Sequence, residues 1–450
     1  MISAKKSLSG SASPFASFGR RQSHRQAIAL ISIQADPASE KVEETALGQS
    51  VYVRQVGEAL CKLGWQVDIF TRKTNPKDAT IVEHSPYCRT IRLVAGPETA
   101  IADGDLIAYL PEFVKALQKF AKGTSYPIVQ THDRLSGWVG LQLQQASNVQ
   151  LIHTYHAPSA IADTQVSLER RILEQANRIV ATNPQELEIL SNLVTQREGI
   201  ELIPCGTDVK NFHAMPKTEA KTKLGFDPNQ QLVLYVGQFA PHKGIDTLVR
   251  AFAQCRKNNP KLAQNSRLVL VGGGATNDSE DSERQRIEQL VRELELENCT
   301  QFAGRVGHDL LPFYYTAADV CVIPSYYEPY GLVAIEAMAC GTPVVASAVG
   351  GLKFTVMQSE TGLLVPPQDT EAFASAIARI LTDQVWAKKL RKQASLRVQE
   401  NFSWASVAIK LSDLYRRLLA QLITQDSLLA SPVNSSESNP TKKLSLTKVS

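Results

Sequence analysis

Hydrophobic and polar positions along the chain follow the alternation of buried strands and amphipathic helices. Short apolar runs, which are typical of buried strands, are each followed by a loop and by a segment with apolar residues at helical spacing. The runs that we expect to form strands are 27–33, 67–70, 128–130, 150–152, 178–181, 232–236, 268–271, 320–323, 343–346 and 363–366. Strands that alternate with helices in this way build parallel sheets of the α/β class.

The strand–helix pattern occurs in two stretches, which predicts two domains. A polar segment with Pro216 and Pro228 lies between them, and Ser403 is a suitable N-cap for a final helix. The expected parts are an extension (1–25), an N-terminal domain (26–210), a linker (211–230), a C-terminal domain (231–403), a last helix (404–425) and a disordered tail (426–450).

Composition and charge narrow the possible partners. The net charge of the 450 residues is +4, but the excess of Lys and Arg lies at the two ends, so the body is slightly acidic and no nucleic-acid partner is expected. The 7 cysteines are scattered without a C-x-x-C pair, which indicates neither a zinc site nor a disulfide framework and suits the cytoplasm. No apolar run approaches the roughly 20 residues of a transmembrane segment. The Ser-rich, basic and acid-free extension suits a plastid transit peptide or, as the alternative, a disordered bacterial extension.

The stretch 324–351 carries the strongest candidate chemistry. A loop with Glu328 follows the strand at 320–323, and a helix that begins near Gly331 carries Glu336. The loop lies at the carboxyl end of a strand and the amino end of a helix, where parallel sheets bind anionic ligands. Glu336 stands among apolar residues, which is unfavourable unless a partner satisfies it. A pair of sugar or ribose hydroxyls is one such partner, and a neighbouring backbone amide is the alternative.

These residues resemble the signature of a known family. Glu328 and Glu336, with Gly331 and the string Gly341-Thr342-Pro343-Val344-Val345, are similar to the Glu-x7-Glu signature of retaining nucleotide-sugar glycosyltransferases of family 4. The similarity extends from about residue 28 to residue 404. It implies the GT-B fold, in which two Rossmann-like parallel-sheet domains face a cleft and a C-terminal helix crosses back to the N-terminal domain. It also implies transfer of a sugar from a nucleoside diphosphate sugar to an acceptor hydroxyl, with retained anomeric configuration and with neither a cofactor nor an obligatory metal.

The resemblance also implies roles for individual residues. Lys243 would clamp the diphosphate, Glu336 would bind the donor ribose, and Glu328 and His153 would contact the donor sugar. By residue type alone, a lysine before a helix would be a surface charge and a histidine at a strand end would be a hydrogen-bonded core residue. The implied catalytic set is His153, Lys243 and Glu328, and the implied donor-binding set is Gly48, Gln238, Lys243, Gly272, Gly273, Val306, Glu328, Tyr330, Gly331, Leu332 and Glu336.

Two further strings have a local interpretation. Gly48, at the start of a helix expected over 50–63, lets the backbone approach a ligand or else forms only a turn. Asp103-Gly104-Asp105 is similar to a metal-binding string of another glycosyltransferase fold, but it precedes an amphipathic helix, so we expect a helix cap.

The acceptor is predicted from the branch that the chain resembles. Gly48-Gln49 and the segment 63–72 look most like the sucrose-phosphate-synthase-like branch, which implies UDP-glucose or ADP-glucose as donor and fructose 6-phosphate as a small sugar-phosphate acceptor. Inositol-phosphate, lipid and polysaccharide acceptors remain open, and the sequence does not predict the oligomeric state.

Several positions near the expected cleft depart from the family pattern. Gln238 stands where the family has an Arg that bridges the diphosphate, and Leu47 replaces a Gly. Gln34-Ala35 replace His-Gly, and Gln165 or Val166 falls where an Arg is expected. These substitutions leave a second hypothesis, a catalytically impaired pseudo-glycosyltransferase that binds sugar nucleotides or sugar phosphates as a regulator or partner subunit. A third hypothesis, an epimerase or phosphorylase with this fold, has no signature in the sequence.

Overall fold

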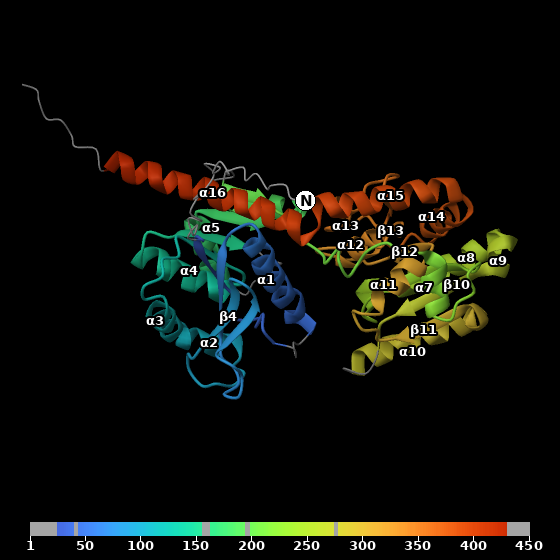
Figure 1. The fold of residues 1–450 in the computed structure, drawn as a ribbon. Helices are drawn as coiled ribbons and strands as arrows, with labels where there is room; N and C mark the ends of the chain where they lie inside the picture. Colours follow the sequence, from blue (N-terminus) through green and yellow to red (C-terminus); the bar gives the residue numbers. More distant parts are fainter. Residues whose placement is uncertain (1–24, 40–43, 155–162, 194–198, 274–277, 430–450) are drawn as a thin grey trace, which may run out of the picture.

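Two α/β lobes make up the molecule in a computed structural model (Figure 1). The structure describes residues 25–39, 44–154, 163–193, 199–273 and 278–429. The N-terminal lobe contains an eight-stranded sheet and the C-terminal lobe a six-stranded one. The two-domain α/β architecture expected from the sequence is therefore confirmed.

The N-terminal sheet has the strand order β3-β4-β2-β1-β5-β6-β7-β8. Its strands are β1 (Ala27–Ile31), β2 (Gln66–Arg72), β3 (Ile81–Ser85), β4 (Cys88–Leu93), β5 (Ile128–Thr131), β6 (Gln150–Thr154), β7 (Arg178–Ala181) and β8 (Ile200–Leu202). Its helices are α1 (Glu44–Lys62), α2 (Asp103–Leu106), α3 (Leu110–Phe120), α4 (Arg134–Ala146), α5 (Asp163–Gln175) and α6 (Pro184–Leu193). Neighbouring strands are parallel except the edge pair β3–β4. The central strands are buried on both faces, as in other sheets covered by helices, whereas β3 is largely exposed and has no apolar run that predicts it.

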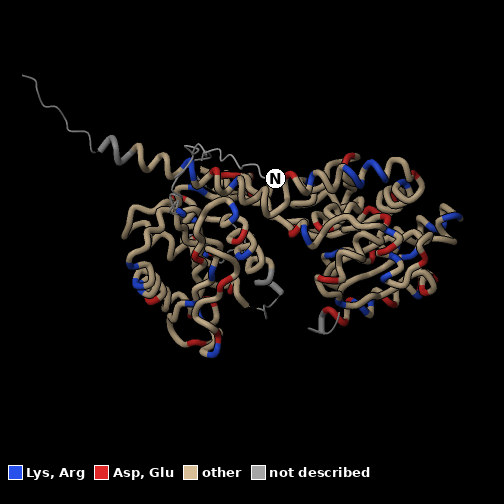
Figure 2. Tube along the Cα trace, in the orientation of Figure 1, with Lys and Arg blue, Asp and Glu red and all other residues tan. Residues whose placement is uncertain are grey.

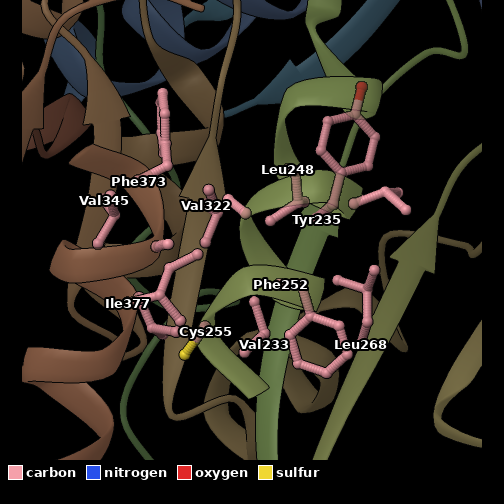
Figure 3. Packing of buried hydrophobic residues seen from close by; sticks show 14 of the residues in the cluster. Val233, Tyr235, Leu248, Phe252, Cys255, Leu268, Val322, Val345, Phe373 and Ile377 are labelled. Carbon is pink, nitrogen blue, oxygen red and sulfur yellow. The ribbon is translucent and has the colours of Figure 1, made fainter. Parts of the chain in front are cut away.

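The C-terminal sheet is parallel throughout, with the order β11-β10-β9-β12-β13-β14. Its strands are β9 (Gln231–Val236), β10 (Ser266–Val271), β11 (Thr300–Gly304), β12 (Val320–Ile323), β13 (Val344–Ser347) and β14 (Gly362–Val365). Its helices are α7 (Lys217–Lys223), α8 (Ile245–Asn258), α9 (Pro260–Asn265), α10 (Asp278–Glu293), α11 (Leu311–Ala317), α12 (Leu332–Ala339), α13 (Leu352–Thr355), α14 (Thr370–Thr382) and α15 (Gln384–Asn401). Figure 3 shows Phe252 of α8 and Phe373 of α14 packed with Val322 in one of the two cores of this sheet.

The last helix, α16 (Trp404–Leu429), joins the lobes. Ser403 caps its start by accepting a hydrogen bond from the Ser406 amide at 3.1 Å. The helix then runs across the N-terminal lobe (Figure 1), where its Leu411 and Tyr415 are buried in the same core as α1. Trp65 of that lobe donates a hydrogen bond from Nε1 to Ser412 Oγ at 2.9 Å. The helical return to the N-terminal domain is confirmed.

The predicted linker contains structure of its own. Residues 211–230 include α7, and three of their side chains, Phe212, Ala220 and Phe226, are buried in the core of the C-terminal lobe. The segment also carries charged residues, and one of them is held by an ion pair with the lobe: Lys217 Nζ lies 2.5 Å from Asp319 Oδ1. Most of this segment is therefore part of the C-terminal lobe rather than a free connection.

Two local expectations differ from the structure. Helix α1 begins at Glu44, so Gly48 lies inside its second turn and not in the preceding loop. A Cβ added at Gly48 would meet nothing within 4 Å, so the glycine is not required for packing. The N-cap of α2 is Ala102 and no side chain caps it; Asp103 instead accepts a hydrogen bond from Gln34 Nε2 at 2.5 Å. None of the helices in the described ranges is long and apolar enough to cross a membrane.

Candidate active site

The loop between β12 and α12 is shaped by glycines. Gly331, the N-cap of α12, has a φ of 71°, which only glycine adopts readily. The Gly351 amide donates a hydrogen bond to the Glu328 carbonyl at 3.0 Å. A Cβ at Gly350, whose φ is +46°, would lie 2.2 Å from that carbonyl oxygen. The close approach of this turn fixes the backbone that carries Glu328 and Tyr330.

A second loop, after β9, packs against the first. Gly244 has a φ of +65°, and a Cβ there would lie 2.2 Å from the carbonyl oxygen of Pro324. The Tyr326 amide donates a hydrogen bond to the His242 carbonyl at 2.8 Å. Because β9 and β12 are adjacent and parallel, both loops leave the same edge of the sheet. Lys243 is thereby brought beside Glu328, 85 positions further along the chain.

Lys243 and Glu328 form a partly buried ion pair. The distance from Lys243 Nζ to Glu328 Oε2 is 2.8 Å, and the two side chains are 20% and 14% exposed. Ser325 Oγ lies 3.5 Å from the same carboxylate oxygen. The pair lines a cavity of about 90 Å³ whose walls are Tyr235, Val236, Gly237, Lys243, Ile323, Ser325, Glu328, Tyr330, Leu332 and Val333. Four of the predicted site residues, Lys243, Glu328, Tyr330 and Leu332, therefore lie around one space.

Glu336 is satisfied by a tyrosine rather than by a backbone amide. The buried Tyr315 of α11 donates its hydroxyl hydrogen to Glu336 Oε2 at 2.8 Å. Burial raises the pKa of Glu336 to about 7, although the Tyr315 hydrogen bond acts in the opposite direction. The carboxyl group is thus close to half ionised at neutral pH. Sequence reasoning missed Tyr315, because its position in α11 has only the ordinary pattern of a core residue.

The glycines at the ends of β9 and β10 bring their backbones into contact. A Cβ at Gly272, where φ is +124°, would lie 1.8 Å from the Gly237 carbonyl oxygen. The Gly272 amide donates to the Gly304 carbonyl at 2.8 Å, at the end of β11. Gly273 and Val306 lie at the same ends of β10 and β11. This part of the predicted donor set therefore lies on the sheet edge that carries Lys243.

Gln238 lies beside these glycines at the end of β9. It is exposed, and its carbonyl accepts a hydrogen bond from Tyr235 OH at 2.7 Å. The backbone of this loop is therefore anchored independently of the side chain at position 238.

In the N-terminal lobe, His153 is the last residue but one of β6, and its side chain is buried. Its Nδ1 lies 2.8 Å from Thr131 Oγ1, on the neighbouring strand β5. Burial lowers the pKa of His153 to about 4, so the ring is neutral at physiological pH. His153 is therefore a neutral hydrogen-bonding group held by its contact with Thr131. The side chains of Leu47, Gln165 and Val166, three of the positions that depart from the family pattern, lie outside the described residues.

A polar cluster centred on Asp133 lies near the start of α1 and was missed at the sequence level. Asp133 caps α4 by accepting from the Ser136 amide at 2.7 Å. Its other oxygen accepts from the Ile33 amide at 3.0 Å and from Gln49 Nε2 at 3.3 Å. The cluster therefore joins the loop after β1 to α1 and to the end of β5. A polar Asp directly after a buried strand was the available signal.

A side chain of the N-terminal lobe contacts the backbone of the Glu328 loop. Asn183, which precedes α6 of the N-terminal lobe, donates from Nδ2 to the Pro329 carbonyl at 3.0 Å. Burial raises the pKa of Tyr330, with additional contributions from Cys205, Glu186 and other groups. The candidate site therefore includes the boundary between the lobes. Within the described residues, no group of three or more His, Cys, Asp or Glu side chains is arranged to hold a metal ion.

Two parallel-sheet domains with a C-terminal helix that returns to the first define the GT-B class of glycosyltransferases. Residues 48–206 match the model of the glycosyl transferase 4-like domain, and residues 216–397 match glycosyl transferases group 1. D-inositol 3-phosphate glycosyltransferase from Rhodococcus erythropolis is 34% identical over 406 residues, which cover 87% of this chain and 91% of that protein. The corresponding protein of Corynebacterium efficiens is 32% identical, over 86% of this chain and 94% of its own length. The chain belongs to the family 4 glycosyltransferases.

Solved structures support the same assignment. Sucrose-phosphate synthase from Thermosynechococcus elongatus is 49% identical, with a TM-score of 0.74 over 88% of this chain and 100% of that one. Anabaena HepE, solved in complex with UDP and glucose, is 18% identical with a TM-score of 0.65, over 87% of this chain and 100% of that one, so it supports the fold alone. The family and the sucrose-phosphate-synthase-like resemblance are confirmed, while the roles of individual site residues stay predictions.

Proposed function

We propose that this chain is a retaining hexosyltransferase that moves glucose from a nucleoside diphosphate glucose to a hydroxyl of a small sugar phosphate. The observation that carries the proposal is the 49% identity with a sucrose-phosphate synthase over 88% of the chain. Fructose 6-phosphate is therefore the first candidate acceptor. UDP-glucose and ADP-glucose are the candidate donors.

The reaction needs positive charge where the leaving group departs. The bond between the anomeric carbon and the diphosphate oxygen breaks, and the acceptor oxygen bonds to that carbon from the same face. The acceptor proton passes to the departing diphosphate, whose growing charge Lys243 would stabilise. Lys243 suits this role because its ion pair with Glu328 positions its ammonium group at the cavity, 2.8 Å from the carboxylate. The proposal requires no protein nucleophile and no metal.

The two carboxylates would bind different parts of the donor. Glu336, when ionised, can accept hydrogen bonds from the two ribose hydroxyls, and Tyr315 orients it through the 2.8 Å hydrogen bond. Glu328 has one oxygen paired with Lys243 and another available for the sugar hydroxyls. His153, a neutral ring in the other lobe, would complete the sugar site from the N-terminal side.

An inositol phosphate is the second candidate acceptor. The relatives named D-inositol 3-phosphate glycosyltransferase are 31–34% identical to this chain over most of its length. Both candidates are small polyols with one phosphate group, so the acceptor side would need cations and hydroxyl-binding groups in either case. Donor consumption with fructose 6-phosphate and with D-inositol 3-phosphate, measured in parallel, separates them.

A pseudo-glycosyltransferase is the second candidate function. Gln238 supports it, because a neutral amide stands where the family has an arginine, and loss of one such stabilising group costs roughly 2.7–4 kcal/mol in the transition state. This alternative predicts donor binding without turnover. If it holds, Gln238→Arg is expected to restore donor consumption.

Lys243→Ala tests the proposed mechanism. We expect kcat for glucose transfer to fall by about 10²–10³, the usual effect of removing one transition-state donor. Lys257→Ala is the matched control, since Lys257 is an exposed lysine in the last turn of α8. Equal kcat values for the two variants would contradict the role of Lys243.

A further inference from the structure

A second cavity lies in the C-terminal lobe and shares no wall residue with the cavity around Lys243 and Glu328, which is called the donor cavity below. Its volume is about 370 Å³, within the usual size range of small-molecule sites. Its walls come from the start of α7 and the segment before it, from α11, from the residues that follow α12, and from α15. They comprise Ala214, Met215, Lys217, Thr316, Cys340, Gly341, Lys388, Arg391, Lys392, Ser395 and Leu396.

All charged side chains in these walls are cations. Lys388 and Lys392 are one turn apart on α15, where two like charges repel each other unless an anion lies between them. Both are exposed, and within the described part of the chain neither forms an ion pair. Figure 2 shows the run of Lys and Arg along α15.

The other two cations are ordered by the protein. Arg391 donates from Nη2 to the Ala318 carbonyl at 3.0 Å, which leaves further N–H groups of its guanidinium available. Lys217 is paired with Asp319 at 2.5 Å, and Lys221 lies 3.5 Å from the other oxygen of that carboxylate. Asp319 therefore offsets part of the charge of α7 and also attracts Arg391 of α15, but it is a single anion among these cations. The cavity keeps an excess of positive charge.

The polar groups between the cations suit one kind of ligand. Thr316 and Ser395 add hydroxyl groups to the wall, and Arg391 has the planar fork that matches phosphate oxygens. The carboxyl end of α12 carries a partial negative charge, which would repel an anion in the cavity. This partial charge is smaller than the full positive charges of the lysines and the arginine. We propose that this cavity binds a phosphate dianion, either inorganic phosphate or the phosphate group of a small phosphorylated metabolite, at a site separate from the donor cavity. The proposal rests on this cavity and not on the proposed transferase reaction.

The location of the cavity connects it to the candidate active site. Cys340 and Gly341 follow directly after α12, and the Cys340 amide donates to the Glu336 carbonyl at 3.1 Å. Thr316 follows Tyr315, whose hydroxyl binds Glu336. An anion in the cavity would therefore contact the two helices that hold Glu336.

Calorimetric titration of the full-length protein with inorganic phosphate and, separately, with glucose 6-phosphate, at constant ionic strength, tests the proposal. We expect saturable binding that the double variant Lys388→Ala/Lys392→Ala weakens by at least about tenfold, as loss of one charge-assisted hydrogen bond predicts. Lys389→Ala is the matched control, because Lys389 is an exposed lysine of the same helix that is absent from the wall. The ligand that binds more tightly to the unsubstituted protein identifies the source of the phosphate group.

Two results would overturn the proposal. One is equal binding of both phosphates by the double variant and by Lys389→Ala. The other is binding that Lys243→Ala abolishes and the double variant leaves unchanged, because that would locate the phosphate in the donor cavity. Failure of glucose transfer would affect neither comparison, so the two proposals are tested independently.

Discussion

At the scale of single residues, the proposed role of Glu336 in binding the donor ribose depends on the ionisation of its carboxyl group. Its pKa of about 7 means that the carboxylate that would accept hydrogen bonds from the two ribose hydroxyls forms as the pH rises through neutrality. We therefore expect the affinity for UDP-glucose, whose diphosphate diester does not titrate in this range, to increase from pH 6 to pH 8. Glu336→Gln should bind the donor about tenfold more weakly, as loss of a hydrogen bond to a charged group predicts, and without that pH dependence. Calorimetry at several pH values measures both effects.

The same residue makes a prediction for stability. Because the pKa of Glu336 lies above the ordinary value of 4.5 for a glutamate, the folded state binds more protons than the unfolded state between those two pH values. This group therefore lowers the free energy of unfolding as the pH rises from about 4.5 to 7, by at most about 3 kcal/mol. Glu336→Gln should raise the thermal midpoint at pH 8 more than at pH 5. An equal change at both pH values would contradict the burial of an ionisable group at this position.

At the scale of elements, α16 completes the N-terminal core. Leu411 of this helix is fully buried against the N-terminal lobe, whereas Ile409 of the same helix is 49% exposed. Leu411→Ala removes buried methyl groups and should destabilise the N-terminal lobe by about 2–5 kcal/mol. Ile409→Ala should change stability by less than about 0.5 kcal/mol. Thermal unfolding of both variants gives the comparison, and equal midpoints would show that α16 contributes little to this core.

The elements also show how far the sequence predicts the fold. Two strands have the expected bounds, Val320–Ile323 and Arg178–Ala181. Each is a short apolar run that is followed by a different kind of residue, Pro324 or Thr182, which marks where the strand ends. Strand β3 has no such run, since it lies at an exposed edge. The start of α1 was placed too late because its first turn is polar. Helix α7 was predicted to be part of the linker because its sequence is polar. Its lysine Lys217 pairs with Asp319, which is 102 positions away, so the sequence around α7 does not reveal the pairing.

The candidate site also has a part that can be predicted from the sequence and a part that cannot. The Glu328–Glu336 spacing is local and can be recognised from the sequence alone. The ion pair of Glu328 with Lys243, the Tyr315 hydrogen bond and the Asp133 cluster join residues distant in the chain, so only the folded sheet edges bring them together. Asp133 in particular looks like an ordinary helix cap in the sequence, and its contact with Gln49 becomes visible only in three dimensions.

At the scale of the whole molecule, the hydrogen bond from Asn183 to the Pro329 carbonyl connects the N-terminal lobe to the loop that carries Glu328. Asn183→Asp keeps an oxygen that can accept from the Glu186 amide at the start of α6, but it replaces the donor to Pro329 with a negative charge. We expect the lobes to separate, with a larger radius of gyration in small-angle X-ray scattering and turnover about tenfold lower, as loss of one hydrogen bond plus repulsion predicts. An unchanged radius and an unchanged kcat would contradict this coupling.

We infer that the cavity around Lys243 and Glu328 is where the molecule transfers glucose with retention. The most direct measurement is proton NMR of the purified protein with UDP-glucose or ADP-glucose and fructose 6-phosphate, followed over time. We expect the donor to be consumed and a product with an α-glucosyl anomeric signal to grow in equal amount. Lys243→Ala should slow this reaction by about 10²–10³. A β-linked product would contradict retention. Binding of the donors without consumption, with every acceptor tried, would contradict the transferase reaction itself.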